Sequence, residues 1–556
     1  MPLTPDMRRS IDQIRDYLFG GGYPDPVSNA EQLSFLFFFY LVEGIDAENR
    51  ARARFLKKSY TSLFEGTWAL KNPLNATAGF AVQESRGARA TALSTAATVP
   101  RERFRWSIWA KGLSGESLVR FVRDEVFAFF AELGEGAAHN FMAGARLTID
   151  EPTVLTQVVN LVDGLRLDQA DADTKGDLFE HVLRQIKQAG ELGQFRTPRH
   201  VIRAIVEMVD PKVGETLYDP AAGTAGFLVA AYNHIRLTNS SPAAITTAEV
   251  DGKLQRRGLG DKLSAAQVSA LNNATFFGND VDPKMVRLAT MNLTLRGLPD
   301  VRIQLRNVLT TTQDAERKAE LGLPADGFHV ILANPPFSGR VDRDRIVEDV
   351  KVGTTTATEL LFLKYMLDSL RPGGRCGVIV PEGVLFGSTG AHKELRRQLI
   401  ENHRVEAVLS LPGGVFQPYS GVKTSVLFFR KGGSTERVLF LHADDDGYKL
   451  DANHDTPIEA DDLPGLAQVY VQRESAWDRW TARDAASEWS EKWWFADAAA
   501  LRANDFNLSA GRYRPMSQAQ VEHRDPRELL DELAAIEAEI AEEIEALRAA
   551  LAVRTA

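Results

Sequence analysis

Residues 328–337 read FHVILANPPF, a short apolar stretch that stops at an asparagine and two prolines. An apolar run of roughly four to eight residues bounded by turn residues predicts a buried strand. Pro335 and Pro336 remove two backbone donors and fix two φ angles, so the strand must end there and the turn that follows must be stiff. A stiff turn at a strand end holds reactive side chains well.

The side chains and carbonyls of this turn suit a planar amine. Asn334 has a side-chain carbonyl, and the prolines leave backbone carbonyls with no neighbouring amide to compete. Acceptors that converge on an exocyclic NH2 pull its hydrogens out of plane and leave the nitrogen lone pair free to attack an electrophile. Phe337 offers a ring on which a flipped base can stack. A purely structural turn would explain the prolines but not the asparagine and phenylalanine that flank them.

Strands alternate with helical stretches between about residues 166 and 470. This alternation predicts an α/β fold with a doubly wound, mostly parallel sheet that helices cover on both faces. In such folds the ligand lies at the carboxyl ends of the strands. The strands that we predict span residues 215–220, 275–280, 328–336, 375–381, 405–412 and 424–429.

A second motif, DPAAGTAGFL at residues 219–228, comes directly after a predicted strand and leads into a helix. Its small residues would let a ligand approach the backbone, and the start of the helix presents free amides. A tight strand-to-helix turn with no ligand is the alternative. The chain has neither the G-x-G-x-x-G nor the G-x-x-x-x-G-K-[ST] pattern, which disfavours a dinucleotide enzyme and an ATP motor.

A third motif, FFGNDVDP at residues 276–283, places Asp280 at the end of the next strand. An acidic side chain there can accept hydrogen bonds from both hydroxyls of a ribose. Asp282 is the rival, but it suits the N-cap of a helix because Pro283 would then be the first helical residue. Asp280 is therefore left for a ligand.

Taken together, these motifs resemble those of the amino-methyltransferases of DNA, and more specifically the modification subunit of type I restriction-modification systems. The four segments that carry the resemblance are GQFRTPR (193–199), DPAAGTAGF (219–227), GNDVDP (278–283) and ANPPF (333–337). Further similar segments are GDLFEHVL (176–183), VPEGVLF (380–386), LPGGVFQPYSGVKTSVLFFRK (411–431) and NDFNLSAGRY (504–513).

The resemblance implies the S-adenosylmethionine-dependent methyltransferase fold and methyl transfer from that cofactor to N6 of a flipped-out adenine. The implied catalytic residues are Asn334, Pro335, Pro336 and Phe337. The implied cofactor-binding residues are Gln194, Phe195, Arg196, Thr197, Pro198, Arg199, Asp219, Gly223, Thr224, Ala225, Gly226, Asp280 and Asn307.

Within that set, QFRTPR would close over the cofactor, residues 224–226 would line its amino-acid end and Asp280 would hold its ribose. Two positions depart from the family pattern. Arg196 stands where a second aromatic is frequent, and Asn307 stands where an aspartate commonly meets the adenine of the cofactor.

The resemblance also implies partners. They are double-stranded DNA, a specificity subunit that reads the target sequence, a restriction subunit with motor and nuclease functions, and a second copy of this chain on each specificity subunit. A formal charge of −10 agrees with this expectation, because a chain that holds DNA unaided needs a basic surface. Two rival functions remain open: glutamine methylation on protein, and an assembly scaffold with an inactive methyltransferase fold.

Composition limits which covalent links, metal sites and membrane segments we expect. The only cysteine is Cys376, so neither a disulfide framework nor a cysteine-rich metal site is expected, and no metal site is predicted. The longest apolar run, FLFFFYLV at 35–42, is far short of the ~20 residues that span a bilayer and predicts a buried helix. We therefore expect a cytoplasmic protein without membrane contact.

Three regions are predicted along the chain. Residues 1–165 form an α-helical domain, residues 166–470 the catalytic domain, and residues 471–556 a carboxyl-terminal region. The segment 101–109, RERFRWSIW, would either contact phosphates and bases or pack with its arginine stems. In the last region a helix at 526–551 carries a narrow apolar stripe that predicts a seam with the specificity subunit, or a contact with its own chain.

Overall fold

The computed structural model describes residues 4–55, 59–77, 98–133, 141–142, 144–188, 197–250, 252–298, 302–337, 339–417, 421–451, 454–475, 491–515 and 544. The chain divides into two units, Met1–Tyr513 and Arg514–Ala556, and the fold below is that of the first. Apart from residue 544, the predicted helix at 526–551 lies outside the described residues, so its role stays a prediction.

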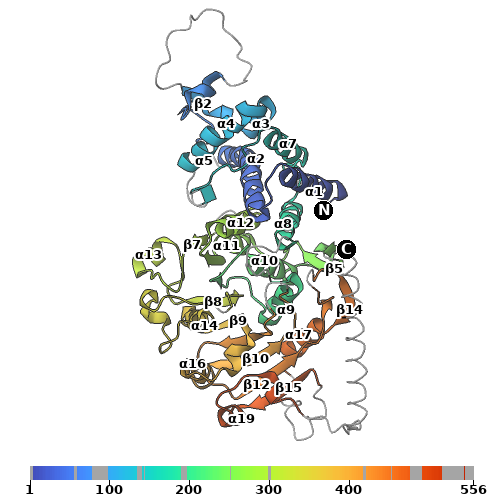
Figure 1. Cartoon of the computed structure of the whole chain (residues 1–556), viewed down its shortest axis with the longest axis vertical. Coiled ribbons are helices and arrows are strands. Elements are labelled where there is room, and N and C mark those ends of the chain that lie inside the picture. Colours follow the sequence, from blue (N-terminus) through green and yellow to red (C-terminus); the bar gives the residue numbers. More distant parts are fainter. Residues whose placement is uncertain are drawn as a thin grey trace, which may run out of the picture. The chain divides into compact units, whose positions relative to one another are not determined.

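One large sheet organises the first unit (Figure 1). Nine strands from the described residues form it in the order β15-β12-β10-β11-β9-β8-β3-β6-β7. Neighbouring strands are parallel except where β11 and β15 pair antiparallel with their neighbours. The predicted α/β class with a mostly parallel sheet is confirmed. In chain order the strands are β3 (Leu217–Asp219), β6 (Phe276–Asp280), β7 (Arg302–Leu305), β8 (Phe328–Ala333), β9 (Leu370–Pro381), β10 (Arg404–Ser410), β11 (Thr424–Arg430), β12 (Arg437–His442) and β15 (Trp493–Asp497).

All six predicted strands are present, as β3, β6, β8, β9, β10 and β11. The sequence prediction missed β7, β12 and β15. Because β15 follows residue 470, the sheet takes an edge strand from the region that was expected to follow the catalytic domain. The three domain limits themselves stay predictions.

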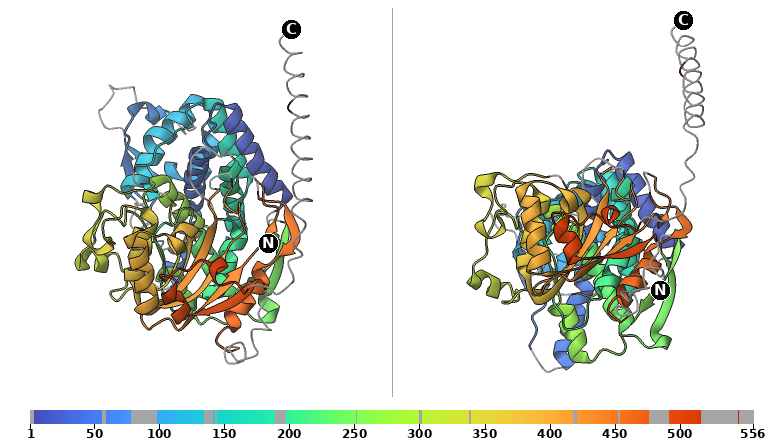
Figure 2. Two further views of the ribbon diagram at one scale, coloured as in Figure 1. Left: turned by 60° about the horizontal axis from the view of Figure 1, so that its bottom comes forward. Right: turned by 90° about the horizontal axis from the view of Figure 1, so that it is seen from below.

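Alternate side chains of each strand face opposite sides of the sheet. In β8, Val330 and Leu332 belong to one hydrophobic cluster, and Ile331 and Ala333 belong to the other. Helices cover both faces, as Figure 2 shows for the green helices on one side and the yellow and orange helices on the other. The first cluster includes α9 (Arg199–Val209), α10 (Gly226–Thr238) and α17 (Leu463–Gln472). The second includes α14 (Thr358–Ser369), α15 (Glu382–Phe386), α16 (Gly390–Glu401) and α19 (Ala498–Ala503).

The amino-terminal region is helical and is built on an aromatic core. Its helices are α1 (Pro5–Gly20), α2 (Pro26–Phe55), α3 (Trp106–Gly112), α4 (Gly115–Phe121), α5 (Phe127–Leu133), α7 (Pro152–Gly164) and α8 (Ala172–Gln188). The predicted buried helix at 35–42 is confirmed within α2, where Phe35, Phe37 and Phe39 are buried. The packed alternative holds for 101–109, because Phe104 stacks on Phe129 with ring centroids 4.0 Å apart.

One helix belongs to both cores. The α12 helix (Pro283–Thr294) contributes Met285 and Leu288 to the amino-terminal core, and Val286 and Ala289 to the core over the sheet.

No described helix is long and apolar enough to cross a bilayer. The remaining elements are the helices α11 (Ala265–Asn273) and α13 (Ala315–Glu320), and the two-stranded ladders β1 (Thr67–Ala69) with β2 (Thr98–Pro100), β4 (Ile245–Val250) with β5 (Lys253–Gly258), and β13 (Asp446–Tyr448) with β14 (Pro457–Asp461).

Arg375 on β9 fixes the carboxyl end of α9 to the sheet. Its Nε donates to the Val209 carbonyl at 2.7 Å and its Nη2 donates to the Asp210 carbonyl at 2.8 Å. Both Nη atoms also donate to the Glu215 carboxylate, at 2.7 and 2.8 Å, just ahead of β3. One guanidinium therefore joins strand β9 to the end of a helix and to the loop ahead of β3.

Replacing this guanidinium tests how much the fold depends on it. Arg375→Met keeps the aliphatic stem but removes all donors, so two helix-end carbonyls and a carboxylate lose their partner. We expect the free energy of unfolding to fall by about 2–4 kcal/mol. Urea unfolding of the full chain measures it. The control is Arg317→Met, which removes an exposed pair with Glu320 inside one helix and should cost about 0.5 kcal/mol or less. Equal losses in the two variants would contradict the anchoring role.

Candidate active site

The loop between β3 and α10 leaves its backbone open to a ligand. Ala225, which precedes α10, has a φ of 63°, a left-handed conformation that costs a non-glycine residue about 1 kcal/mol. Its side chain has no oxygen, so it cannot cap the amide groups at the start of α10. Gly223 has a φ of 51°, and a Cβ added there would meet no heavy atom within 4 Å. Uncapped amides and open space therefore lie in one loop, as the sequence predicted.

Asp280 at the end of β6 holds this loop to the neighbouring strand. Its Oδ2 accepts from the Gly223 amide and its Oδ1 accepts from the Asp282 amide, each at 2.9 Å. Burial raises the pKa of Asp280, although both amide donors oppose the rise. A carboxylate has about four acceptor positions, so two amides leave capacity for hydroxyl donors.

Asp282 is the N-cap of α12, as predicted. Its side chain accepts from the Lys284 amide at 2.8 Å, and Pro283 is the first helical residue. The two aspartates therefore have different local partners, although they are two positions apart.

Asp219 supports the loop from inside the molecule. It is 2% exposed, and its Oδ1 accepts from the Ala221 amide at 3.0 Å. Burial and the nearby charge of Asp280 raise the pKa of Asp219 to about 8, with the Ala221 amide acting in the opposite direction. The visible role of Asp219 is to shape the loop, and direct contact with a cofactor stays a prediction.

Asn334 directly follows β8, which lies next to β3 in the sheet. Its Nδ2 donates to Thr197 Oγ1 at 2.9 Å. Its Oδ1 is buried and accepts no hydrogen bond from the described residues. A buried carbonyl oxygen without a donor is rare in folded proteins and requires an explanation. The strand order β8-β3-β6-β7 also brings the predicted strand-end residues to neighbouring positions at one edge of the sheet.

The rest of the turn is firmly packed. Pro335 is buried and Pro336 is exposed, and the Pro336 carbonyl accepts from Thr358 Oγ1 at 3.4 Å. Phe337 is only 7% exposed and meets the Phe416 ring edge-on, with centroids 5.7 Å apart. Stacking of a base on Phe337 stays a prediction, since it needs more of that ring to be accessible.

Thr197, Pro198 and Arg199 lie at the start of α9. Arg199 forms an ion pair with Glu180 of α8. Asn292 of α12 donates from Nδ2 to the same Glu180 carboxylate at 3.2 Å and to the Thr224 carbonyl at 2.8 Å. This chain of polar contacts joins the segment that carries Thr197 to the loop after β3.

The remaining cofactor candidates are less constrained. Asn307 follows β7, and its Oδ1 accepts from the Leu309 amide at 3.0 Å in a local turn. Gln194, Phe195 and Arg196 lie outside the described residues. Their roles, like that of Asn307, stay predictions.

Comparison with known proteins identifies the family of the chain. The N-6 DNA methylase family matches residues 170–523. The chain belongs to this family. The EcoEI methylase subunit, from a type I restriction enzyme of Escherichia coli, is 30% identical over 463 residues, which cover 79% of this chain and 84% of that protein.

Two solved structures resemble this methylase along most of its length. A chain from a type I R-M system, solved to explain complex assembly and conformational transition, has a TM-score of 0.68 and 25% identity, and the match covers 98% of each chain. A type I methyltransferase subunit from Streptococcus thermophilus has a TM-score of 0.62 and 17% identity, covering 92% of this chain and 99% of that chain, and it shows the fold alone.

The resemblance stated from the sequence motifs is confirmed by these relatives. The predicted enzyme class, an adenine-specific DNA methyltransferase, is confirmed by the family. Family membership also favours DNA over protein glutamine as the substrate, and an enzyme over an inactive scaffold.

Sequence reasoning missed a polar network beneath the site of the methylase. Tyr218 donates from its hydroxyl to Asn279 Oδ1 at 2.6 Å, and the Tyr218 and Tyr365 hydroxyls are 2.9 Å apart. Burial raises the pKa of Tyr218 well above its ordinary value. It also missed Glu180 and Asn292. Asn292 had a usable signal, since it lies between the apolar residues Met291 and Leu293 in a helical stretch.

The raised pKa of Asp219 predicts a specific pH dependence of stability. The folded methylase binds this proton more tightly than the unfolded chain does, so the stabilisation is complete below the ordinary pKa of about 4 and is lost as the pH rises through about 8. The free energy of unfolding should therefore decline from pH 6 to pH 9 by urea titration. Asp219→Asn, which keeps an acceptor for the Ala221 amide, should flatten that decline.

The control is Asp261→Asn. Asp261 is exposed and accepts from the Ser241 amide at 2.8 Å. Hydrogen bonding to the Ser241 side chain and to this amide lowers the pKa of Asp261, so its effect on stability falls at acidic pH and not between pH 6 and pH 9. This variant should keep the wild-type slope. If Asp219→Asn also keeps that slope, Asp219 does not titrate in this range.

Proposed function

We propose that this chain is the methylating subunit of a type I restriction-modification complex. It transfers a methyl group from S-adenosylmethionine to N6 of an adenine that is flipped out of double-stranded DNA, at a site that a separate specificity subunit selects. The observation that carries the proposal is the buried Asn334 Oδ1, which lacks a donor among the described residues while its Nδ2 is held by Thr197. That oxygen is suited to accept a hydrogen bond from an exocyclic amine.

The residues at the strand ends fit the cofactor. Asp280 retains acceptor capacity for two ribose hydroxyls beyond its two amide bonds. The loop at Gly223 has room for close approach of a ligand to the backbone, and the uncapped start of α10 offers amides to a carboxylate group. When bound, the cofactor supplies an electrophilic methyl group on a positively charged sulfur.

Asn334 prepares the amine for attack. Its Oδ1 accepts one N6 hydrogen and its amide orientation is fixed by the bond to Thr197. The stiff turn at Pro335 and Pro336 then keeps the acceptor in place, so little reorganisation is needed at the moment of reaction. In the transfer, N6 gains a bond to the methyl carbon, the bond between that carbon and the sulfur breaks, and N6 gives up one proton to solvent.

The proposed partners rest on the relatives of the chain and on its formal charge. The EcoEI relative is a methylase subunit of a type I restriction enzyme, and a structural neighbour comes from a study of R-M complex assembly. A formal charge of −10 on this chain means that a partner supplies much of the attraction for DNA phosphate. We assign that part to a specificity subunit that binds two copies of this chain, with a restriction subunit joining the assembly.

Removing the Asn334 amide tests the reaction directly. Asn334→Ala should lower methyl transfer by at least about 100-fold, as loss of one preorganised polar group does at other sites. Binding of S-adenosylmethionine should stay within about 2-fold, since Asn334 contacts the base and not the donor. Transfer is measured with labelled cofactor and DNA in the complex with the specificity subunit, and binding by calorimetry.

The matched control is Asn273→Ala. Its Nδ2 donates only locally, to the Ser269 carbonyl at 2.8 Å near the end of α11, so transfer should stay at the wild-type rate. Nucleoside digestion of the product should give N6-methyladenine, and no transfer should occur without the specificity subunit. Near-normal turnover by Asn334→Ala would refute the assignment of the catalytic amide, whereas N4-methylcytosine would refute only the choice of adenine.

The two aspartates after β6 give a second test, which separates cofactor binding from stability. Asp280→Ala should weaken S-adenosylmethionine binding by about 1.5–3 kcal/mol, the usual cost of a lost charged hydrogen bond. Asp282→Ala should leave the affinity near wild type and lower the free energy of unfolding by about 1 kcal/mol, because it removes an N-cap. Calorimetry and urea unfolding of both variants measure the pair of effects. The reverse pattern would mean that the two roles are exchanged.

A further inference from the structure

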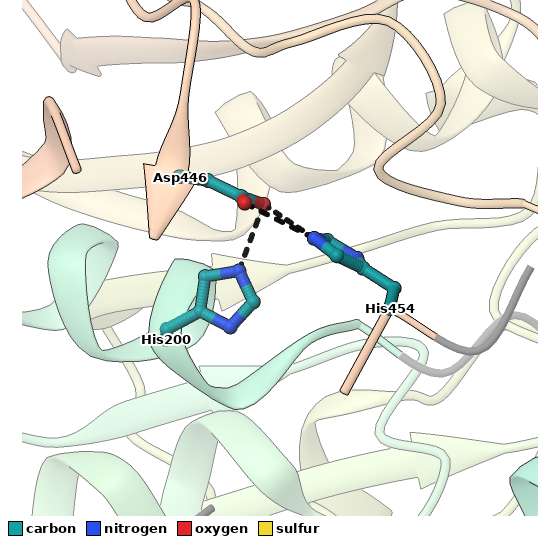
Figure 3. A group of neighbouring side chains, drawn as sticks. All are labelled: His200, Asp446 and His454. Carbon is teal, nitrogen blue, oxygen red and sulfur yellow. Dashed lines mark hydrogen bonds and ion pairs between the residues drawn. The ribbon is translucent and has the colours of Figure 1, made fainter. Parts of the chain in front are cut away.

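Three side chains from separate segments converge outside the methyl-transfer site (Figure 3). His200 comes from the first turn of α9, Asp446 begins β13, and His454 lies in the segment before β14. His200 Nε2 is 2.8 Å from Asp446 Oδ2, and His454 Nε2 is 3.0 Å from Asp446 Oδ1. One ligand atom from each residue lies within 4.8 Å of the other two.

The cluster is buried. The Asp446 side chain is fully buried, the His454 side chain is 1% exposed, and the His200 side chain is 11% exposed. The Tyr448 ring stacks on the His200 ring, with centroids 4.4 Å apart and planes 23° apart. A carboxylate this deep in the fold needs a positive partner, because burying an unpaired charge costs several kcal/mol or more.

The outer nitrogen of His454 indicates how its ring is used. His454 Nδ1 is 3.2 Å from the Val415 carbonyl, which can only accept a hydrogen bond. Nδ1 therefore carries a hydrogen, and in a neutral ring this leaves Nε2 as a bare lone pair facing the Asp446 carboxylate. Two acceptors face each other stably only when a proton or a metal cation lies between them, so either an imidazolium or a bound metal ion answers the buried charge of Asp446. A ring whose outer N–H donates to a backbone carbonyl is the usual arrangement of a histidine that binds a metal.

We propose that His200, Asp446 and His454 bind a divalent transition-metal ion, with Zn²⁺ as the best fit. Two imidazole nitrogens and one carboxylate oxygen form a common zinc ligand set that leaves a fourth position for water. Ligand atoms around a tetrahedral ion with bonds of about 2.0–2.1 Å lie about 3.3 Å apart, so the His–Asp separations of 2.8 and 3.0 Å open by about 0.3–0.5 Å to admit it. The sequence analysis predicted no metal site, and this inference replaces that expectation.

The location of the cluster gives the ion a structural role. His200 lies on α9 three positions after Thr197, whose hydroxyl accepts from Asn334. The backbone of His454 is itself held in place, with a φ of 43° and its amide donating to Asp451 Oδ1 at 2.9 Å. The ion thus clamps the β13–β14 hairpin to the start of the helix that orients the amide. It does not touch the methyl acceptor, so it carries out no step of the proposed reaction itself.

Metal content of the full chain tests the proposal. The purified chain is stripped with a chelator, dialysed, and given Zn²⁺ alone. We expect about one Zn²⁺ per chain by mass spectrometry after removal of excess ion, together with a rise in Tm. The variants Asp446→Asn and His454→Gln should each retain less than about a fifth of that ion and show no rise in Tm.

The matched control is His234→Gln. His234 forms a similar half-buried pair with Asp210, at 2.8 Å, but the described residues offer no third ligand there. This variant should bind Zn²⁺ as the wild type does. So that the test does not depend on the folding of the cluster variants, Co²⁺ is also added to the stripped wild type. The visible absorption of a tetrahedral site should appear, and Zn²⁺ should abolish it. A stripped wild type that takes up neither ion, or cluster variants that bind Zn²⁺ like the wild type, would overturn the proposal.

Discussion

The hydrogen bond from Asn334 Nδ2 to Thr197 Oγ1 is the contact on which the site depends. The two ends of an asparagine amide are nearly equal in size but opposite in hydrogen bonding, so only a partner can fix which end faces the substrate. With Nδ2 held by the threonine hydroxyl, Oδ1 becomes the end that is left for an amine. Rotating the Asn334 amide by 180° would turn Nδ2, which donates, toward an amine, which also donates. The preference for an amine would then be lost. The chemistry of the turn therefore rests on a residue 137 positions away.

Thr197 in turn depends on how α9 is held. At the start of the helix, Arg199 pairs with Glu180 of α8, and at its end Arg375 binds the last carbonyls and Glu215. Glu180 also accepts from Asn292, which donates to the Thr224 carbonyl in the loop after β3. The helix that orients the amide and the loop that we propose faces the cofactor thus share one polar network. Such a network holds the two parts of a site in fixed relative positions only if each of its polar groups has a hydrogen-bond partner.

Charge in the site favours the cofactor and not DNA. Burial raises the pKa of Asp219 to about 8, with the charge of Asp280 adding to the rise, and burial also raises the pKa of Asp280. A ligand with a positively charged sulfur favours the ionised form of both groups, so binding and ionisation support each other. Once ionised by a bound cofactor, these groups also repel phosphate. The formal charge of −10 on the chain opposes phosphate in the same way, which agrees with the proposal that a separate chain supplies much of the affinity for DNA.

The sequence could predict the strand ends but not which residues meet across the fold. Six strands were found because each is an apolar run that stops at a turn residue, and the Asp282 cap was found because Pro283 follows it. The strand β7 was missed because its sequence, RIQL, is short and half polar. The strand β15 was missed because its tryptophan-rich sequence was interpreted as irregular structure, and only its pairing with β12 makes it an edge strand. Thr197 was placed at the site by resemblance alone. His200 and Asp446 are 246 positions apart, and no local pattern marks either as a partner of the other. Contacts of that kind depend on strand order, and strand order is a property of the whole sheet that no single segment encodes.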